Sequence, residues 1–297
     1  MEQNQEQTHI RKNWYDKNYK LLLLIPLVLI LFSIIYMVVF YSNTGDIFRK
    51  DISLTGGTTI TIFEKINSQQ IQDDLSESLE ELNTREISDL LTGEQTAIII
   101  ETTTGSTETK KVLEEYFGYK LDNENSSFEF TGSTLSESFY KQLLIAILIA
   151  FIFMSIVVFI IFRTLVPSSA VIISAFADIL MTLVLANIIG IKMSIAGIVA
   201  LLMLIGYSVD TDILLTTRVL KRHDGSINER IYGAFKTGLT MTFTSLFAVL
   251  FALFIVKSFS VVLTQIFTIL IIGLGFDILN TWITNTSILK WYVESKK

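Results

Sequence analysis

Four aspartates lie inside stretches of sequence that are otherwise apolar enough to cross a membrane: Asp178, Asp210, Asp212 and Asp277. A carboxylate at the centre of a bilayer costs at least roughly 2.5–3.5 kcal/mol, so such residues usually face the interior of a bundle or a water-filled path. Burial and nearby like charges both favour the neutral acid, which brings proton exchange within reach of neutral pH. The chemistry that this pattern favours is reversible protonation, and all four are candidates for a proton relay.

Asp210 and Asp212 are two residues apart, which separates their side chains by about 200° around a helix. They can contact the same neighbour only if the helix is locally unwound, an adjustment that Gly206 and the hydroxyl of Thr211 would tolerate. A structural role is the alternative. A protonated aspartate can donate a hydrogen bond between helices, or a charged one can pair with Arg218 through water.

The depth of these acids in the membrane follows from the rise of about 1.5 Å per helical residue. Counted from the same side of the membrane, Asp178, Asp210 and Asp277 lie roughly 15, 12 and 20 Å inside their spans. A shared depth on three helices permits a cluster of carboxylates, provided that those helices are neighbours.

Six apolar blocks are each long enough for a transmembrane helix, because a hydrocarbon core of roughly 30 Å takes about 20 helical residues. They cover about 21–40, 142–162, 169–189, 194–217, 237–256 and 260–289. Residues 1–20, Arg163, 218–236 and 290–297 hold 13 of the 23 basic residues, whereas the two short loops on the other side contribute only Lys192 and Lys257. Since basic residues favour the cytoplasmic side, both termini are predicted to be cytoplasmic, in a multi-pass protein of the cell membrane.

The predicted organisation is a cytoplasmic segment 1–20, a first transmembrane helix 21–40, an extracytoplasmic domain 41–140, transmembrane helices two to six in 141–290, and a cytoplasmic tail 291–297. Within 41–140, strand patterns at 58–63, 85–91, 96–103 and 126–133 alternate with helical patterns at 68–82 and 107–117. The order βαββαβ predicts an α+β, ferredoxin-like domain: a four-stranded antiparallel sheet with two helices on one face. TGEQ (92–95) is the predicted hairpin turn.

Several classes of function are disfavoured by composition. Segment 41–140 has 19 acidic and 7 basic residues, a net charge of −12, which makes it a poor candidate for nucleic-acid binding.

Gly56 and Gly57, in DISLTGGTT, allow a tight turn or a close backbone approach. No GxxxxGK[ST] motif is present, so no nucleotide site is predicted. The chain has no cysteine, and neither His9 nor His223 has neighbours suited to a metal site. We therefore expect no cofactor and no metal.

GYSVDTDILLTTRVL (206–220) resembles the SecD/SecF family of protein-export membrane subunits, most closely its archaeal, SecF-type branch. DISLTGGT after the first span and FDILNTWITNTSILKWY (276–292) in the last also match, in the same order and with the same six-span layout. The resemblance implies one six-helix half of a resistance-nodulation-division fold, with a larger SecD-like subunit supplying the other half.

The resemblance further implies an accessory role, not that of an enzyme, beside the Sec protein-conducting channel. Protons crossing the lipid bilayer through the assembly would drive movements of the external domain that draw exported polypeptides outward. Two positions depart from the bacterial pattern. Bacterial relatives have a single acid in GYSINDT, where GYSVDTD places Thr211 between two acids, and they carry an arginine in the fifth span, where this chain has Met241.

Two alternatives come from other classes of function. A stand-alone proton-coupled transporter of small solutes could have the same fold, and would form a homodimer to complete the two halves. GLGFD (273–277), with a second acid on another span, is similar to the paired aspartates of intramembrane aspartyl proteases. Its GxGxD spacing is one residue longer than their GxGD.

Overall fold

The computed structural model describes residues 14–89, 91–222 and 225–296. In that part of the chain, six helical segments are long and apolar enough to cross a membrane, as predicted. The first combines α1 (Trp14–Leu22) and α2 (Leu24–Thr44), and the next four are α6 (Ser133–Phe162), α7 (Leu165–Ile188), α8 (Ile195–Lys221) and α9 (Ile227–Val256). The sixth runs through α10 (Val261–Leu279), a π-helical segment η1 (Asn280–Asn285) and α11 (Thr286–Ser295). Most of the predicted segment 1–20 lies outside the described residues.

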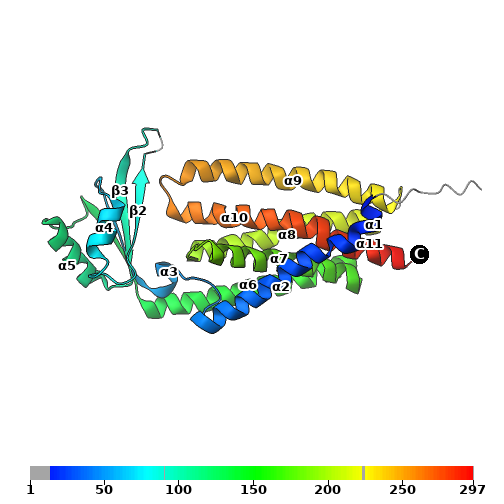
Figure 1. Cartoon of the computed structure of the whole chain (residues 1–297), viewed down its shortest axis with the longest axis horizontal. Coiled ribbons are helices and arrows are strands. Elements are labelled where there is room, and N and C mark those ends of the chain that lie inside the picture. Colours follow the sequence, from blue (N-terminus) through cyan, green and yellow to red (C-terminus); the bar gives the residue numbers. More distant parts are fainter. Residues whose placement is uncertain (1–13, 90, 223–224, 297) are drawn as a thin grey trace, which may run out of the picture.

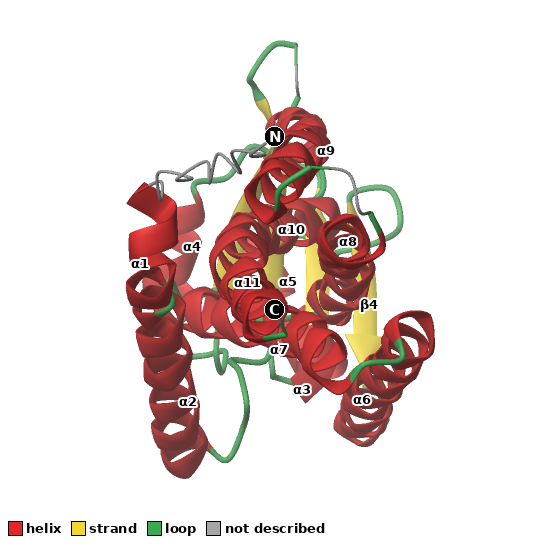
Figure 2. Ribbon diagram, turned by 90° about the vertical axis from the view of Figure 1, so that its right-hand side faces the viewer, coloured by secondary structure: helices red, strands yellow, loops and turns green. Residues whose placement is uncertain are grey.

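The six spans form an elongated bundle with the α+β domain at one end and both ends of the described chain at the other (Figure 1). Viewed along the bundle, α7, α8 and α10 with α11 lie in the middle, whereas α2, α6 and α9 lie at the edges (Figure 2). Accordingly, α7 and α8 are mostly buried, and the three outer spans expose most of their apolar side chains. The central helices therefore provide the only interior in which polar side chains of the described bundle can be shielded from lipid.

The α+β domain has the predicted order βαββαβ. Its strands are β1 (Gly57–Ile62), β2 (Asn83–Ser88), β3 (Gln95–Thr102) and β4 (Ser126–Thr131), all antiparallel and arranged β2-β3-β1-β4. The helices are α4 (Ser68–Leu75) and α5 (Ser106–Phe117). One face of the sheet packs its isoleucines against both helices, in a core that includes Ile60, Ile98, Ile71 and Leu113. This is the ferredoxin-like arrangement.

The first of these helices is shorter than the predicted 68–82, because α4 ends at Leu75. Leu79 is still buried in the same core at the helical spacing of Ile71 and Leu75, so the apolar pattern continues after the helix has ended. The chain turns because the carbonyl of Glu80 accepts hydrogen bonds from the backbone and hydroxyl of Thr103. Pairing with the end of β3 thus replaces the last helical turns.

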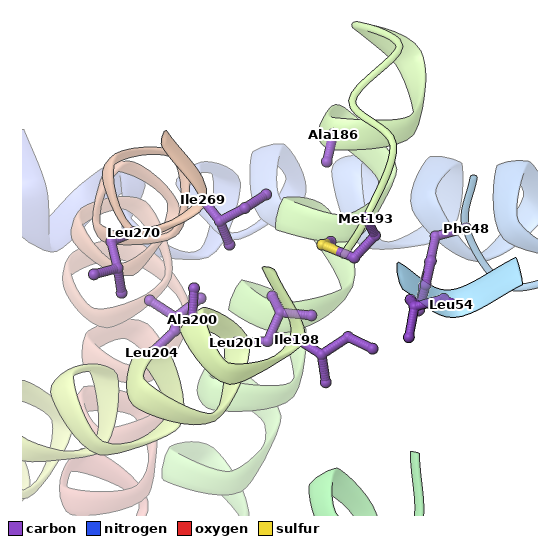
Figure 3. Packing of buried hydrophobic residues seen from close by; sticks show 10 residues of the cluster. All are labelled: Phe48, Leu54, Ala186, Met193, Ile198, Ala200, Leu201, Leu204, Ile269 and Leu270. Atoms are coloured by element: carbon purple, nitrogen blue, oxygen red, sulfur yellow. The ribbon is translucent and has the colours of Figure 1, made fainter. Parts of the chain in front are cut away.

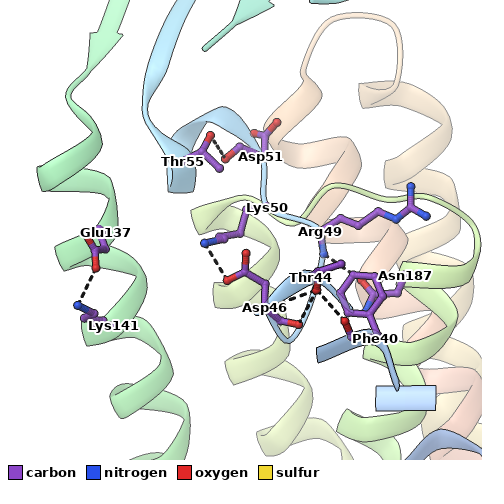
Figure 4. A network of polar contacts seen from close by, with 10 residues as sticks. All are labelled: Phe40, Thr44, Asp46, Arg49, Lys50, Asp51, Thr55, Glu137, Lys141 and Asn187. Atoms are coloured by element: carbon purple, nitrogen blue, oxygen red, sulfur yellow. Dashed lines mark hydrogen bonds and ion pairs between the residues drawn. The ribbon is translucent and has the colours of Figure 1, made fainter. Parts of the chain in front are cut away.

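The α+β domain joins the bundle through a short connection that includes α3 (Ile52–Thr55). Phe48 and Leu54 from this connection are buried with Met193 and with apolar residues of α8 and α10 (Figure 3). Polar contacts add to this packing, because Asn187 at the end of α7 accepts from the backbone N–H of Arg49 (Figure 4). The amide of Asn187 also donates to the carbonyl of Ile47. The connection is therefore held against the central helices by both apolar and polar contacts.

Gly56 and Gly57 follow α3 at the point where the chain passes closest to its neighbours. Their φ angles are +87° and +150°. A β-carbon at Gly56 would lie 2.6 Å from the backbone of Ser133, and one at Gly57 would lie 2.3 Å from the carbonyl oxygen of Thr102. The glycine pair thus lets the backbone pass close to the beginning of α6 and the end of β3, as expected from the sequence.

Candidate functional site: a buried carboxylate cluster

Three of the four aspartates in the spans meet in the interior of the bundle. Asp178 on α7, Asp212 on α8 and Asp277 on α10 are each completely buried, whereas Asp210 on α8 is exposed on the bundle surface. Helix α8 is continuous from Ile195 to Lys221, so the 200° between positions 210 and 212 sends the two carboxylates to opposite faces. The structure places Asp212, and not Asp210, beside the acids of α7 and α10.

Asp178 has a hydrogen-bond donor on each carboxylate oxygen. The hydroxyl of Ser208 on α8 donates to Oδ2, and the amide of Asn280 donates to Oδ1 over 2.7 Å. Both neighbours come from other helices, and together they fix the carboxylate between α7, α8 and η1. An acid held by two donors in this way accepts hydrogen bonds best in its ionised form.

Asp212 and Asp277 are linked through one hydroxyl. Oγ1 of Thr281 lies 2.9 Å from Oδ1 of Asp212 and 3.1 Å from Oδ1 of Asp277. Oγ1 of Thr211 lies 3.0 Å from Oδ1 of Asp277. Because a hydroxyl carries a single proton, Thr281 can donate to only one of the two acids at a time. The pair is satisfied when one of these carboxyl groups carries a proton of its own.

The two oxygens of Asp212 differ in their surroundings. Oδ1 accepts from Thr281, from the amide of Asn285 at 2.7 Å and from the hydroxyl of Ser174 at 3.3 Å. Oδ2 is buried with no hydrogen-bond partner among the described residues, and so is Oδ1 of Asn285. A buried unpaired acceptor is costly, and protonation on Oδ2 would turn it into a donor. The oxygen of Asp212 that has no donor is therefore a position at which the cluster can take up a proton.

No positive side chain of the described chain forms an ion pair with the cluster. Arg218, considered above as a partner through water, donates instead to the carbonyl of Gly233 on α9. Met241, which the resemblance set against an arginine of bacterial relatives, is exposed on α9. In the described residues, no three carboxylate or imidazole side chains are arranged to hold a metal ion. Hydrogen bonds alone offset the burial of these acids.

Most of the donors around the acids were not among the residues singled out from sequence. Asn280, Thr281 and Asn285 belong to η1, the π-helical segment in the middle of the sixth span. A π-helical turn displaces the following side chains relative to an α-helix, and such segments are frequent at functional sites. The signal in the sequence was the run of polar residues in DILNTWITNT directly after Asp277, inside a span that is otherwise apolar.

Asp210 belongs to a separate, outward-facing surface of α8. Met203, Gly206 and Tyr207 lie on this face at helical spacing, and all are exposed. A β-carbon at Gly206 would contact nothing within 4 Å. The face is therefore open in the single chain, with a carboxylate in the middle of an apolar surface.

Comparison with known proteins shows the family to which the chain is similar. The model for "Protein export membrane protein SecD/SecF, C-terminal" matches residues 109–295. Protein-export membrane protein SecF of Methanocaldococcus jannaschii is 43% identical over 282 residues, covering 93% of this chain and 96% of that protein. SecF of Pyrococcus furiosus is 37% identical, covering 94% and 92%. The match extends over both the α+β domain and the bundle.

Solved structures agree on the fold. The crystal structure of SecDF, a translocon-associated membrane protein from Thermus thermophilus, superimposes with a TM-score of 0.71 at 18% identity over 93% of this chain. SecDF in its super-membrane-facing form gives a TM-score of 0.61 over 94%. The chain spans only 38% and 39% of those two chains.

Proposed function

Because the chain belongs to the SecD/SecF family of protein-export membrane proteins, we propose that it is an accessory subunit of the Sec machinery that pairs with a SecD-like subunit. In this proposal both termini are cytoplasmic and the α+β domain lies outside the cell membrane. The assembly uses the proton gradient to assist translocation of polypeptides through the Sec channel. The distribution of Lys and Arg near the spans supports the orientation.

The observation that carries the proton-driven part is the cluster of Asp178, Asp212 and Asp277. Three carboxyl groups are buried together, and no residue in the described part of the chain forms an ion pair with them. They therefore cannot all be ionised at an acceptable cost. Binding a proton removes part of the repulsion between the carboxylates, and losing a proton restores a buried negative charge. A change in protonation therefore alters the hydrogen bonds that join α7, α8 and η1, which gives the bundle two arrangements between which protons can select.

The size of the driving force limits what each step can do. Moving one charge through a potential of 100 mV supplies about 2.3 kcal/mol. A folded domain is stable by about 5–15 kcal/mol. One proton could therefore bias a movement of the α+β domain, but would not unfold a stable substrate. This fits assistance to a polypeptide that is already extended in the channel.

The open face of α8 supports a partner subunit. Asp210 is exposed there beside Met203, Gly206 and Tyr207, and a carboxylate facing lipid at this depth is unfavourable. We propose that this face contacts the SecD-like subunit, with the small Gly206 permitting close helix packing. The two acids of GYSVDTD then have different tasks: Asp212 binds the proton, and Asp210 contacts the partner.

The decisive experiment compares Asp212→Asn with Asp210→Asn in proteoliposomes or membrane vesicles that contain the partner and the channel. We expect Asp212→Asn to assemble normally and to export polypeptide at a rate that no longer depends on the proton gradient. Asp210→Asn should reduce the yield of the complex on purification, while the complexes that do form keep their dependence on the gradient.

Two outcomes would contradict the proposal. If export by the Asp212→Asn complex still responds fully to the gradient, Asp212 is not the proton-binding group. If the wild-type chain purifies from native membranes as a homodimer without a SecD-like subunit, the stand-alone transporter becomes the better explanation, because that reading needs a second copy to complete the fold.

A further inference from the structure

A cavity of about 440 Å³ lies at the end of the bundle opposite the α+β domain, and none of the clustered aspartates lines it. Several elements border this open cavity: the end of α6, the residues just before α7, the end of α8, the beginning of α9, and α11. Its described lining is Phe162, Thr164, Val219, Leu220, Lys221, Arg230, Tyr292, Val293 and Lys296. The cavity therefore sits where five segments leave or enter the apolar part of the bundle.

The charge of this lining is entirely positive. Lys221, Arg230 and Lys296 line the cavity, and none of the described lining residues is acidic. The two ammonium groups are accompanied by aromatic rings: Lys221 Nζ lies 5.9 Å from the ring centroid of Phe162, and Lys296 Nζ lies 4.6 Å from that of Tyr292. Three cations around one apolar-walled cavity repel one another unless an anion lies between them.

Two polar atoms of the lining are left without partners. Thr164 Oγ1 and Arg230 Nε are both buried, and neither has a hydrogen-bond partner in the described structure. The rest of the Arg230 guanidinium is anchored, because Nη1 donates to the carbonyls of Val219 and Arg222. Buried polar atoms are rarely unpaired. Thr164 and Arg230 both border the cavity, so a turn of either side chain would bring an unpaired donor to an anionic oxygen ligand held by the lysines.

The position of the cavity indicates which anion fits. Two of the helices that are long and apolar enough to cross a membrane end beside the cavity, α6 at Phe162 and α8 at Lys221. The remaining walls are apolar, from Val219, Leu220 and Val293. A phosphate group bound to the cations with an acyl or alkyl chain along these apolar walls matches both parts of the lining. We propose that this cavity is a binding site for a phosphate-bearing anion, namely the headgroup of an anionic membrane phospholipid.

The test uses the purified full chain, with any subunit that accompanies it, in detergent. Phosphatidylglycerol, phosphatidylcholine and inorganic phosphate are titrated separately, and binding is read by native mass spectrometry and by the shift in the thermal unfolding midpoint. We expect phosphatidylglycerol to bind and to raise the midpoint, and phosphatidylcholine, which has no net charge, to bind much more weakly. The variant is Lys221→Gln/Lys296→Gln, which removes two cations and leaves the carbonyl contacts of Arg230 intact.

The matched control is Lys17→Gln/Lys236→Gln, which removes the same charge from exposed lysines outside the cavity. Since one basic residue near an anionic surface contributes about 1 kcal/mol, the cavity variant should bind phosphatidylglycerol at least about tenfold more weakly than the control. Thr164→Val should weaken binding without any change in charge. Protection by inorganic phosphate equal to that by phosphatidylglycerol would support the anion site but assign it to a free phosphate. Equal binding of phosphatidylglycerol by the cavity variant and the control would overturn the proposal.

Discussion

Glu101 on β3 is a buried acid outside the membrane spans, at the junction between the α+β domain and the bundle. Its side chain lies on the face of the sheet opposite the helices, where the amide of Asn83 donates to Oε2 over 2.8 Å and the guanidinium of Arg85 lies 3.7 Å away. Burial, and to a lesser extent the charge of Asp51, raise the pKa of Glu101, while Arg85 and Asn83 act in the opposite direction. The folded domain therefore favours the protonated form.

This raised pKa predicts how Glu101→Gln changes the pH dependence of stability. A group whose pKa is higher in the folded state stabilises fully below its unfolded pKa, about 4.3, and that contribution is lost as pH rises through the folded value. Glutamine stays neutral, so the variant should gain stability relative to wild type as the pH rises above the unfolded pKa and through the raised folded pKa of Glu101. Thermal unfolding of the full chain at several pH values measures this. A variant that loses stability relative to wild type as pH rises would show that the contact with Arg85 dominates.

At the same scale, Asp210 and Asp212 show which features of the site can be predicted from sequence and which cannot. The presence of acids in apolar spans, and the opposite directions of these two side chains, follow from residue type and helical period alone. Which of the two faces inward depends on how α8 is rotated against α7 and α10. That rotation is set by long-range packing, for example of Leu204 against Gly273, and no local pattern contains it.

At the scale of elements, the turn at Gly56 predicts a clear substitution effect. Gly56→Ala places a β-carbon 2.6 Å from the backbone of Ser133 and at a φ of +87°. Backbone cannot move aside as a flexible side chain can, and the conformation of Gly56, φ 87° with ψ 154°, costs a residue other than glycine about 1–3 kcal/mol. We expect the free energy of unfolding to fall by at least about that amount, measured as a lower midpoint in a denaturant or thermal titration.

Gly105→Ala is the matched control for this substitution. Gly105 precedes α5 with a φ of −64°, and a β-carbon there would contact nothing within 4 Å. The control should change the midpoint little. If the two variants unfold at the same midpoint, the junction between α3 and α6 is looser than the close approach at Gly56 indicates.

Helices and strands could be predicted from the sequence where neighbouring residues alone determine them. The six spans follow from hydropathy, because the bilayer requires about 20 apolar residues whatever the rest of the chain does. The end of α4 did not follow, because Leu79 keeps the helical spacing of Ile71 and Leu75 while the chain has already turned toward β3. The sequence also did not predict the π-helical segment η1. Its polar residues indicate hydrogen-bond donors near the buried acids, but they do not indicate that the helix widens there.

At the scale of the whole molecule, the α+β domain contacts both loops at its end of the bundle. The connection before α3 pairs with the loop between α7 and α8: Met193 N–H donates to the carbonyl of Arg49, and Asp51 N–H donates to the carbonyl of Met193 over 2.9 Å. The end of β2 contacts the loop between α9 and α10, where Ser88 N–H donates to the carbonyl of Ser258 over 2.9 Å. Two contacts thus join the domain to the helices that carry the buried acids.

If protonation of the bundle moves the α+β domain, the contact between Ser88 and Ser258 must open or slide during export. Ser88→Cys/Ser258→Cys introduces the only cysteines of the chain. The backbone hydrogen bond between the two positions makes them neighbours, and a disulfide forms where the Cα atoms are about 4.4–6.8 Å apart. Oxidation should abolish the gradient-dependent part of export, and a reductant should restore it. Thr61→Cys/Ser127→Cys, which joins paired residues inside the sheet, is the control and should leave export unchanged. Full export by the oxidised Ser88–Ser258 variant would show that the domain works without separating from this loop.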